Sequence, residues 1–145
     1  MVCTFFGHSE CYGLDAGVLR SSIEELIRSG VDTFYVGNQG DFDRMVLGCL
    51  RELGKTYGHI SFSAVLAYLP PPKSEYDPYE GHSIYPAGME IGPTRFAIER
   101  RNRWMIDRAT VCLCYITHRW GGAYKFARLA KRRGLRVINL GDKEL

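Results

Sequence analysis

The chain has 145 residues, of which 46% are hydrophobic and 24% charged, and its formal net charge is +3. This length suits one domain with its own hydrophobic core, so we expect a single domain over 1–145. The composition is ordinary for a folded protein, no run of about 18 apolar residues could span a membrane, and so small a net charge disfavours nucleic acid as a partner.

Strand and helix patterns alternate in the first half of the chain. Short β-rich runs predict strands, and apolar residues that recur at helical spacing predict helices. The expected elements are a strand over 2–6, a helix from Val18 to Gly30, a strand over 33–36, a helix from Asp41 to Gly54 and a strand over 60–69.

The alternation stops at about 70–93, a stretch rich in proline, glycine and tyrosine that lacks clear periodicity. Long loops in compact domains are often lids or binding loops, but a surface excursion with one short strand around 83–85 is equally open. The remaining expected elements are a helix from Pro93 or Thr94 to about Asp107, a strand over 111–116, a helix over about 123–133 and a strand over 136–140.

This order of elements predicts an α/β fold. Strands that alternate with amphipathic helices indicate a Rossmann-like domain, with an open, mostly parallel five-stranded sheet and helices on both faces. Right-handed crossovers restrict the strand order, and we favour 3-2-1-4-5. In such a sheet, ligands bind outside the carboxyl ends of the strands, near the switch between strands 1 and 4.

Three glycine-bearing turns follow expected strands at this edge. They are GHSECYG at 7–13, GNQG at 37–40 and THRWGG at 117–122. Each leads into a helix, whose first turn offers free backbone N–H groups and the positive end of the helix dipole. One such turn can simply close a connection, but three at one edge predict a pocket for phosphate or a nucleotide.

Two carboxylates begin the helix after the second turn. Asp41 is a preferred residue type for the N-cap of that helix, and Asp43 would favour the positive end of its dipole. Carboxylates also repel phosphate, so a ribose hydroxyl, an amide or an amine is the better neighbour for either one. The second turn is therefore expected to contribute to the pocket without cradling phosphate.

The helix expected to end near Asp107 carries a polar residue on its apolar face. The stripe at helical spacing consists of Ile98, Asn102, Met105 and Ala109. An unpaired amide in such a stripe is costly, so the amide of Asn102 either bonds to a neighbouring loop backbone or faces the ligand. A nearby arginine, Arg101 or Arg95, could supply a positive charge to phosphate.

Five cysteines, several of them inside apolar runs, favour reduced thiols and a cytoplasmic protein over a disulfide framework. Cys112 and Cys114 alternate along a strand and so share one face, while His8 and Cys11 lie in one loop at a spacing that could chelate. A tetrahedral metal site needs a second ligand pair, which the sequence does not offer. We therefore expect no metal and no cofactor, and cysteines that pack as small apolar residues.

Four stretches of the sequence resemble one known family. They are TFFGHSECYG, VGNQGDFDRM, RRNRWMIDRATVCLCY and RWGGAYKFARLAKRRG. Through them the chain resembles, over nearly its full length, the SLOG superfamily (the SMF/DprA–LOG group), and most closely its YpsA-like branch. The third stretch is the most specific, because an Arg-Asn-x-x-Met-hydrophobic-Asp helix that runs into a strand is characteristic of that branch.

The resemblance implies a Rossmann-like protein that binds a nucleotide or a nucleotide-derived ligand, such as an NAD-derived signal, and that self-associates into a homo-oligomer. The residues implied for ligand binding are Gly7, His8, Ser9, Gly37, Gly40, Arg101, Asn102, Gly121 and Gly122. Asn38 and Asp41 of the second turn complete the expected set.

One class of relatives, the LOG enzymes, hydrolyses nucleoside monophosphates to free bases. Its motif resembles Pro-Gly-Gly-x-Gly-Thr-x-x-Glu, but the stretch at 120–128 lacks the third glycine and the threonine and has Arg128 in place of the catalytic glutamate. Because acid–base catalysis needs a carboxylate near the glycosidic bond, we favour a binding or sensing module. A hydrolase that uses Asp43 or Glu99 is the first alternative. DNA binding of the DprA kind is the second, and it would need a continuous basic face.

Overall fold

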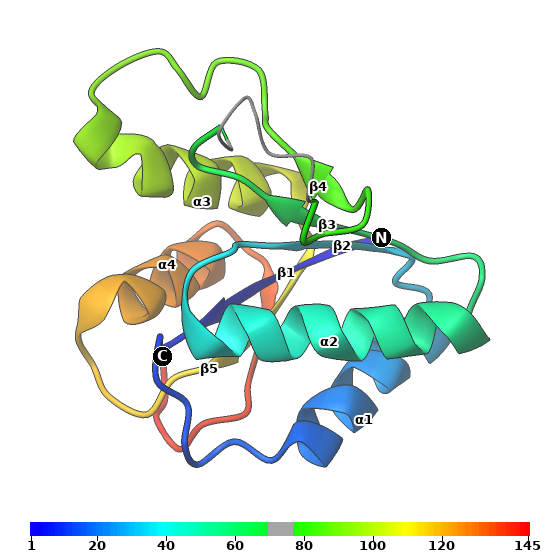
Figure 1. The fold of residues 1–145 in the computed structure, drawn as a ribbon. Helices are drawn as coiled ribbons and strands as arrows, with labels where there is room; N and C mark the ends of the chain where they lie inside the picture. The colour runs from blue at the N-terminus through cyan, green and yellow to red at the C-terminus, as the bar shows by residue number, and fades with distance from the viewer. Residues whose placement is uncertain (70–76) are drawn as a thin grey trace.

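The computed structural model describes residues 1–69 and 77–145, within which six parallel strands form one sheet with helices on both faces (Figure 1). The strand order is β4-β3-β2-β1-β5-β6. The elements are β1 (Val2–Gly7), α1 (Ala16–Arg28), β2 (Thr33–Val36), α2 (Gly40–Thr56), β3 (Ser61–Val65), β4 (Ser83–Ile84), the 3₁₀ turn η1 (Thr94–Phe96), α3 (Ala97–Arg108), β5 (Val111–Tyr115), α4 (Gly121–Arg132) and β6 (Arg136–Asn139).

The sheet confirms the expected α/β class and the expected order of five strands, but it has a sixth strand at one edge. This strand, β4, has only two residues, Ser83 and Ile84, which pair with Ala64 and Val65 of β3. Two residues are too few to show an alternating pattern, so the five-strand count omitted it. The short strand lies in the stretch for which a surface excursion was one of the two open alternatives.

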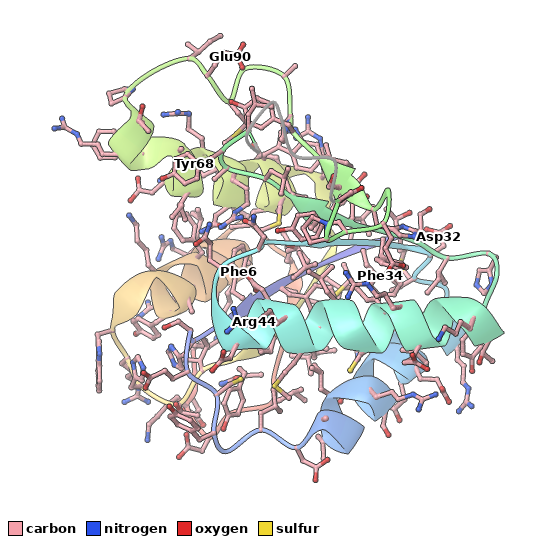
Figure 2. All side chains as sticks on the ribbon, viewed as in Figure 1. Phe6, Asp32, Phe34, Arg44, Tyr68 and Glu90 are labelled. Atoms are coloured by element: carbon pink, nitrogen blue, oxygen red, sulfur yellow. The ribbon has the colours of Figure 1, made fainter. Side chains whose placement is uncertain are left out.

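The two faces of the sheet carry separate hydrophobic clusters. Phe34 and other residues of one face pack with α1 and α2, whereas Phe6 and the opposite face pack with α3 and α4. Figure 2 labels both phenylalanines inside the fold. Since β1 pairs with β2 on one side and β5 on the other, the switch in strand order falls at the centre of the sheet.

The carboxyl end of β1 is held tightly against the start of α2. A Cβ added to Gly7 would lie 2.1 Å from the ring of Phe42, which is fully buried. Gly40, at φ +88°, leaves similarly little room, because a Cβ there would lie 2.6 Å from Cα of Ser9. The N–H of Asp41 donates to the carbonyl of Ser9 over 2.8 Å, so the first and second glycine turns form one packed unit.

The long loop expected over 70–93 is described from residue 77 onward, and its first residues lie outside the described ranges. Asn38 donates to the hydroxyl of Tyr79, and Arg100 donates to the carbonyls of Met89 and Pro93. These bonds attach the loop to the turn after β2 and to the start of α3.

All five cysteines are buried and none is in a disulfide, as expected for thiols that pack as apolar residues. Cys112 and Cys114 lie on the face covered by α3 and α4. In the described part of the chain, no group of three or more His, Cys, Asp or Glu side chains is placed to hold a metal ion. No helix formed by the described residues is long and apolar enough to cross a membrane.

We predict that Gly7→Ala lowers the free energy of unfolding by about 2 kcal/mol or more, because the new methyl group must displace the buried ring of Phe42. The control is Gly48→Ala on the exposed side of α2, where nothing lies within 4 Å of an added Cβ. That change should raise stability by about 0.5–1 kcal/mol. Urea unfolding of the wild type and the two variants measures both changes in stability. Equal stabilities of Gly7→Ala and the wild type would refute the close packing of Phe42 against Gly7.

Candidate functional site

A cavity of about 670 Å³ opens at the carboxyl ends of β1 and β5. Its walls come from four segments: the loop at 7–13, the turn after β2, the inner face of α3, and the segment at 117–123 that leads into α4. In Figure 1, α2 and α4 both begin at the left of the view, the direction in which β1 points. The cavity thus lies at the switch in strand order, where open parallel sheets place their ligands.

The structure brings most of the expected site residues together, although they come from the end of β1 and the loop after it, the turn after β2, and the helices α2, α3 and α4. Those that line the cavity are Gly7, His8, Ser9, Gly37, Asp43, Arg101, Asn102, Gly121 and Gly122. Those that do not are Asn38, Gly40, Asp41 and Glu99. None of the described residues of the long loop, from 77 to 93, lines it either.

Arg101 is the buried cation of the site, with only 2% of its surface exposed. Its Nε donates to Oδ1 of Asn102 over 2.7 Å, and its Nη1 donates to the Val65 carbonyl and to Oδ1 of Asn38. Nη2 has no acceptor among the described residues, and no ion pair found there includes Arg101. Burial lowers the pKa of Arg101, which the carboxylate of Asp43 partly offsets.

Asp43 is the buried carboxylate of the site, and it lies next to Gly37, as Arg101 does. A Cβ added to Gly37 would come within 2.9 Å of both the guanidinium group and Oδ2 of Asp43. The N–H of Gln39 donates to that oxygen over 2.9 Å. Burial raises the pKa of Asp43 to about 6, against the lowering effects of this bond and of Arg101 and Arg44.

The expected N-cap of α2 is corrected by the structure, whereas Asp43 lies in the first turn of this helix as expected. Gln39, not Asp41, is the N-cap, and it makes no side-chain cap bond. Asp41 is the second residue of the helix, where it pairs with Arg44 at the surface. Asp43, within the first turn of the helix, accepts the N–H of the N-cap residue Gln39.

Among the described residues, Asn102 does not form the bond to a loop backbone that was one of the two alternatives for it. Its Oδ1 accepts from Arg101, so its partner is a neighbouring side chain and not a loop backbone. Its Nδ2 has no acceptor among the described residues, and Asn102 lines the cavity. Asn38, by contrast, bonds to both Arg101 and Tyr79.

The first turn of α4 supplies backbone donors to the cavity. Trp120 is its N-cap and provides no side-chain cap bond, so the initial N–H groups stay open to a ligand. Gly121 adopts φ +88°, a conformation that favours glycine. Nothing lies within 4 Å of a Cβ added to Gly122, so a side chain at this position would enter open space.

A row of aromatic rings forms another part of the wall. His8 accepts the N–H of Thr117 at Nε2 over 3.1 Å, and burial together with the neighbouring His118 lowers the pKa of His8. The rings of His8 and His118 stack with their centroids 3.5 Å apart, and Trp120 stacks on His118 at 3.9 Å. His118 and Trp120 were not among the expected site residues, because His8 is far from them in the chain and the sequence does not show that these rings stack.

Glu99, one of two carboxylates considered for catalysis, lies outside the cavity. It forms an ion pair with Lys125 of α4 at 2.7 Å, and this ammonium group lowers the pKa of Glu99. Its position on α3 points it toward α4. Of the two carboxylates, only Asp43 can therefore reach a ligand in the cavity.

The chain matches no known family model and no curated protein. These comparisons lend no support to the resemblance to the SLOG superfamily, which rests on the four sequence stretches. The geometry of the cavity consequently carries the functional argument.

We predict that Asp43→Asn stabilises the protein at neutral pH. Because the pKa of Asp43 is raised on folding, its contribution to stability is complete below the ordinary aspartate range and is lost as the pH rises through about 6. The amide removes that loss, so the variant should exceed the wild type by about 2–3 kcal/mol at pH 8 and match it near pH 4.

Urea unfolding across this pH range measures the effect. Asp41→Asn, which alters an exposed carboxylate of the same helix turn, is the control, and it should change stability by less than about 0.5 kcal/mol at either pH. A pH-independent difference between Asp43→Asn and the wild type would contradict the assignment.

Proposed function

We propose that this chain binds a nucleotide or nucleotide-derived ligand in the cavity at the carboxyl edge of its sheet, as a binding or sensing module of the SLOG kind. One observation carries the proposal: a buried arginine without an ion-pair partner among the described residues and the uncapped N-terminus of α4 open into the same cavity. Both features favour an anion. Self-association into a homo-oligomer and a cytoplasmic location remain proposals from the resemblance and from the cysteine content.

The chemistry of the walls suggests a place for each part of such a ligand. The N–H groups of Gly121, Gly122 and the residue that follows suit a phosphate, as does Nη2 of Arg101, which has no acceptor in the described part of the chain. The carboxylate of Asp43 repels phosphate and accepts hydrogen bonds, so it suits a ribose hydroxyl or a base N–H. This division agrees with the expectation that the second turn contributes to the pocket without cradling phosphate.

A hydrolase acting on the glycosidic bond of nucleotides is the second candidate, and one observation favours it. Asp43 lines the cavity and its pKa is raised to about 6, which is the range of carboxyl groups that exchange protons near neutral pH. Position 128, where the LOG enzymes have their catalytic glutamate, is an arginine, and Glu99 forms a surface ion pair. Neither position therefore supplies a second carboxylate next to Asp43. Binding without hydrolysis is therefore the better supported function.

The first test places a negative charge where the phosphate is proposed to lie. Gly122→Asp projects a carboxylate into empty space at the start of α4, a position where aspartate also favours the helix dipole. We expect the variant to be at least as stable as the wild type and to bind AMP about tenfold more weakly or worse. Gly122→Asn, which has the same shape and no charge, is the matched control.

Binding is measured by thermal stabilisation with AMP, ADP, NAD, ADP-ribose and inorganic phosphate. A ligand at 100 times its Kd should add about 2.7 kcal/mol of apparent stability to the wild type and to Gly122→Asn. Equal stabilisation of all three proteins would place the phosphate elsewhere. The absence of stabilisation by every phosphate compound would refute the proposed function.

The second test separates binding from hydrolysis. We expect the wild-type protein, incubated with nucleoside monophosphates or NAD, to release no free base above the level of a buffer blank, as measured by chromatography. Steady release of adenine or nicotinamide that Asp43→Asn abolishes, and that Glu99→Gln leaves intact, would establish the hydrolase instead.

A further inference from the structure

The rim of the cavity carries an aromatic surface that phosphate binding does not require. Trp120 is 69% exposed, although burial of a tryptophan is strongly favourable. It lines the cavity, one face of its indole is covered by His118, and its large exposed fraction leaves much of the remaining ring surface open to solvent. Tyr12, from the first loop, lines the same cavity and is 89% exposed.

The stack behind Trp120 is fixed to the fold at its inner end. His8 is buried, and its ring nitrogen accepts the backbone N–H of Thr117. His118 lies on His8 with an angle of 16° between the ring planes, and Trp120 lies on His118 at 23°. The three nearly parallel rings therefore hold the indole plane in place, which lowers the entropic cost of stacking one more ring on it.

The position of Trp120 in the sequence joins this surface to the proposed phosphate site. Trp120 is the N-cap residue of α4, so the free N–H groups of Gly121 and Gly122 follow it directly. A ligand that uses both must carry a planar aromatic ring and an anionic group a short distance apart. Nucleotides have that combination, whereas sugar phosphates and inorganic phosphate lack the ring.

The geometry points to Trp120 as the base-stacking residue of the cavity, so that the ligand is selected as a nucleotide and not as a sugar phosphate. This inference rests on the proposed function and specifies its ligand class. The base lies on the outer face of the indole as a fourth ring in the series His8, His118, Trp120. Stacking on an aromatic side chain is tolerant of base identity, so the site discriminates nucleotide from non-nucleotide more strongly than one base from another.

The test compares AMP, ribose 5-phosphate and inorganic phosphate on the wild type, Trp120→Ala and Trp120→Phe. We expect Trp120→Ala to weaken AMP binding by about 5- to 150-fold and to leave the affinity for the other two compounds unchanged. Trp120→Phe should restore a large part of the AMP affinity. Phe96→Ala, which removes an exposed aromatic ring outside the cavity, is the control and should bind AMP as the wild type does.

Fluorescence gives a second readout of the same contact. Because the chain has two tryptophans, Trp104→Phe leaves Trp120 as the sole tryptophan, and AMP but not ribose 5-phosphate should quench its emission. Unchanged AMP affinity in Trp120→Ala, with AMP still bound by the wild type, would overturn the stacking role and leave the proposed function standing. A Trp120→Ala variant that differs from the wild type in its association state alone would likewise overturn the stacking role. Failure of the wild type to bind any of the three compounds would overturn both.

Discussion

The contact between Gly7 and the ring of Phe42 determines how the rest of the site is arranged. With no side chain at the end of β1, the first turn of α2 lies directly against the strand, and a Cβ would have no room. Phe42 fills the core beneath, so the next residue, Asp43, is turned toward Gly37 and Arg101. The same closeness lets Ser9 accept the N–H of Asp41, which joins two of the loops that form the cavity.

The buried polar groups of the cavity oppose folding and favour binding. Asp43 and Arg101 are both almost completely buried, yet they do not form an ion pair within the usual distance. Desolvation of such groups costs stability that a partner normally restores. A ligand that supplies an anion to Arg101 and a donor to Asp43 would restore it on binding. Sites of this kind are commonly less stable than an apolar core of the same shape would be.

The sequence predicted the sheet order and the loops that meet at its edge, because periodicity and glycine turns are local signals. It offered a short strand around 83–85 only as one of two alternatives, because the two residues of β4 show no pattern, and it did not predict that Gln39 is the N-cap of α2. Asn102 was identified from its place in an apolar stripe, but its partner Arg101 is its immediate neighbour in the chain and shares no such signal. The stack of His8, His118 and Trp120 joins two distant loops, so tertiary structure alone reveals it.

The central claim is that a phosphate group binds at the first turn of α4. Its most direct measurement is a titration of ¹⁵N-labelled protein with AMP, followed through the backbone amide signals. The account predicts that the largest shift changes occur at Gly121 and Gly122, with further changes at His8 and Ser9 across the cavity. Changes centred instead on exposed arginines of α3 and α4, such as Arg103 and Arg128, or no change at saturating AMP, would contradict it.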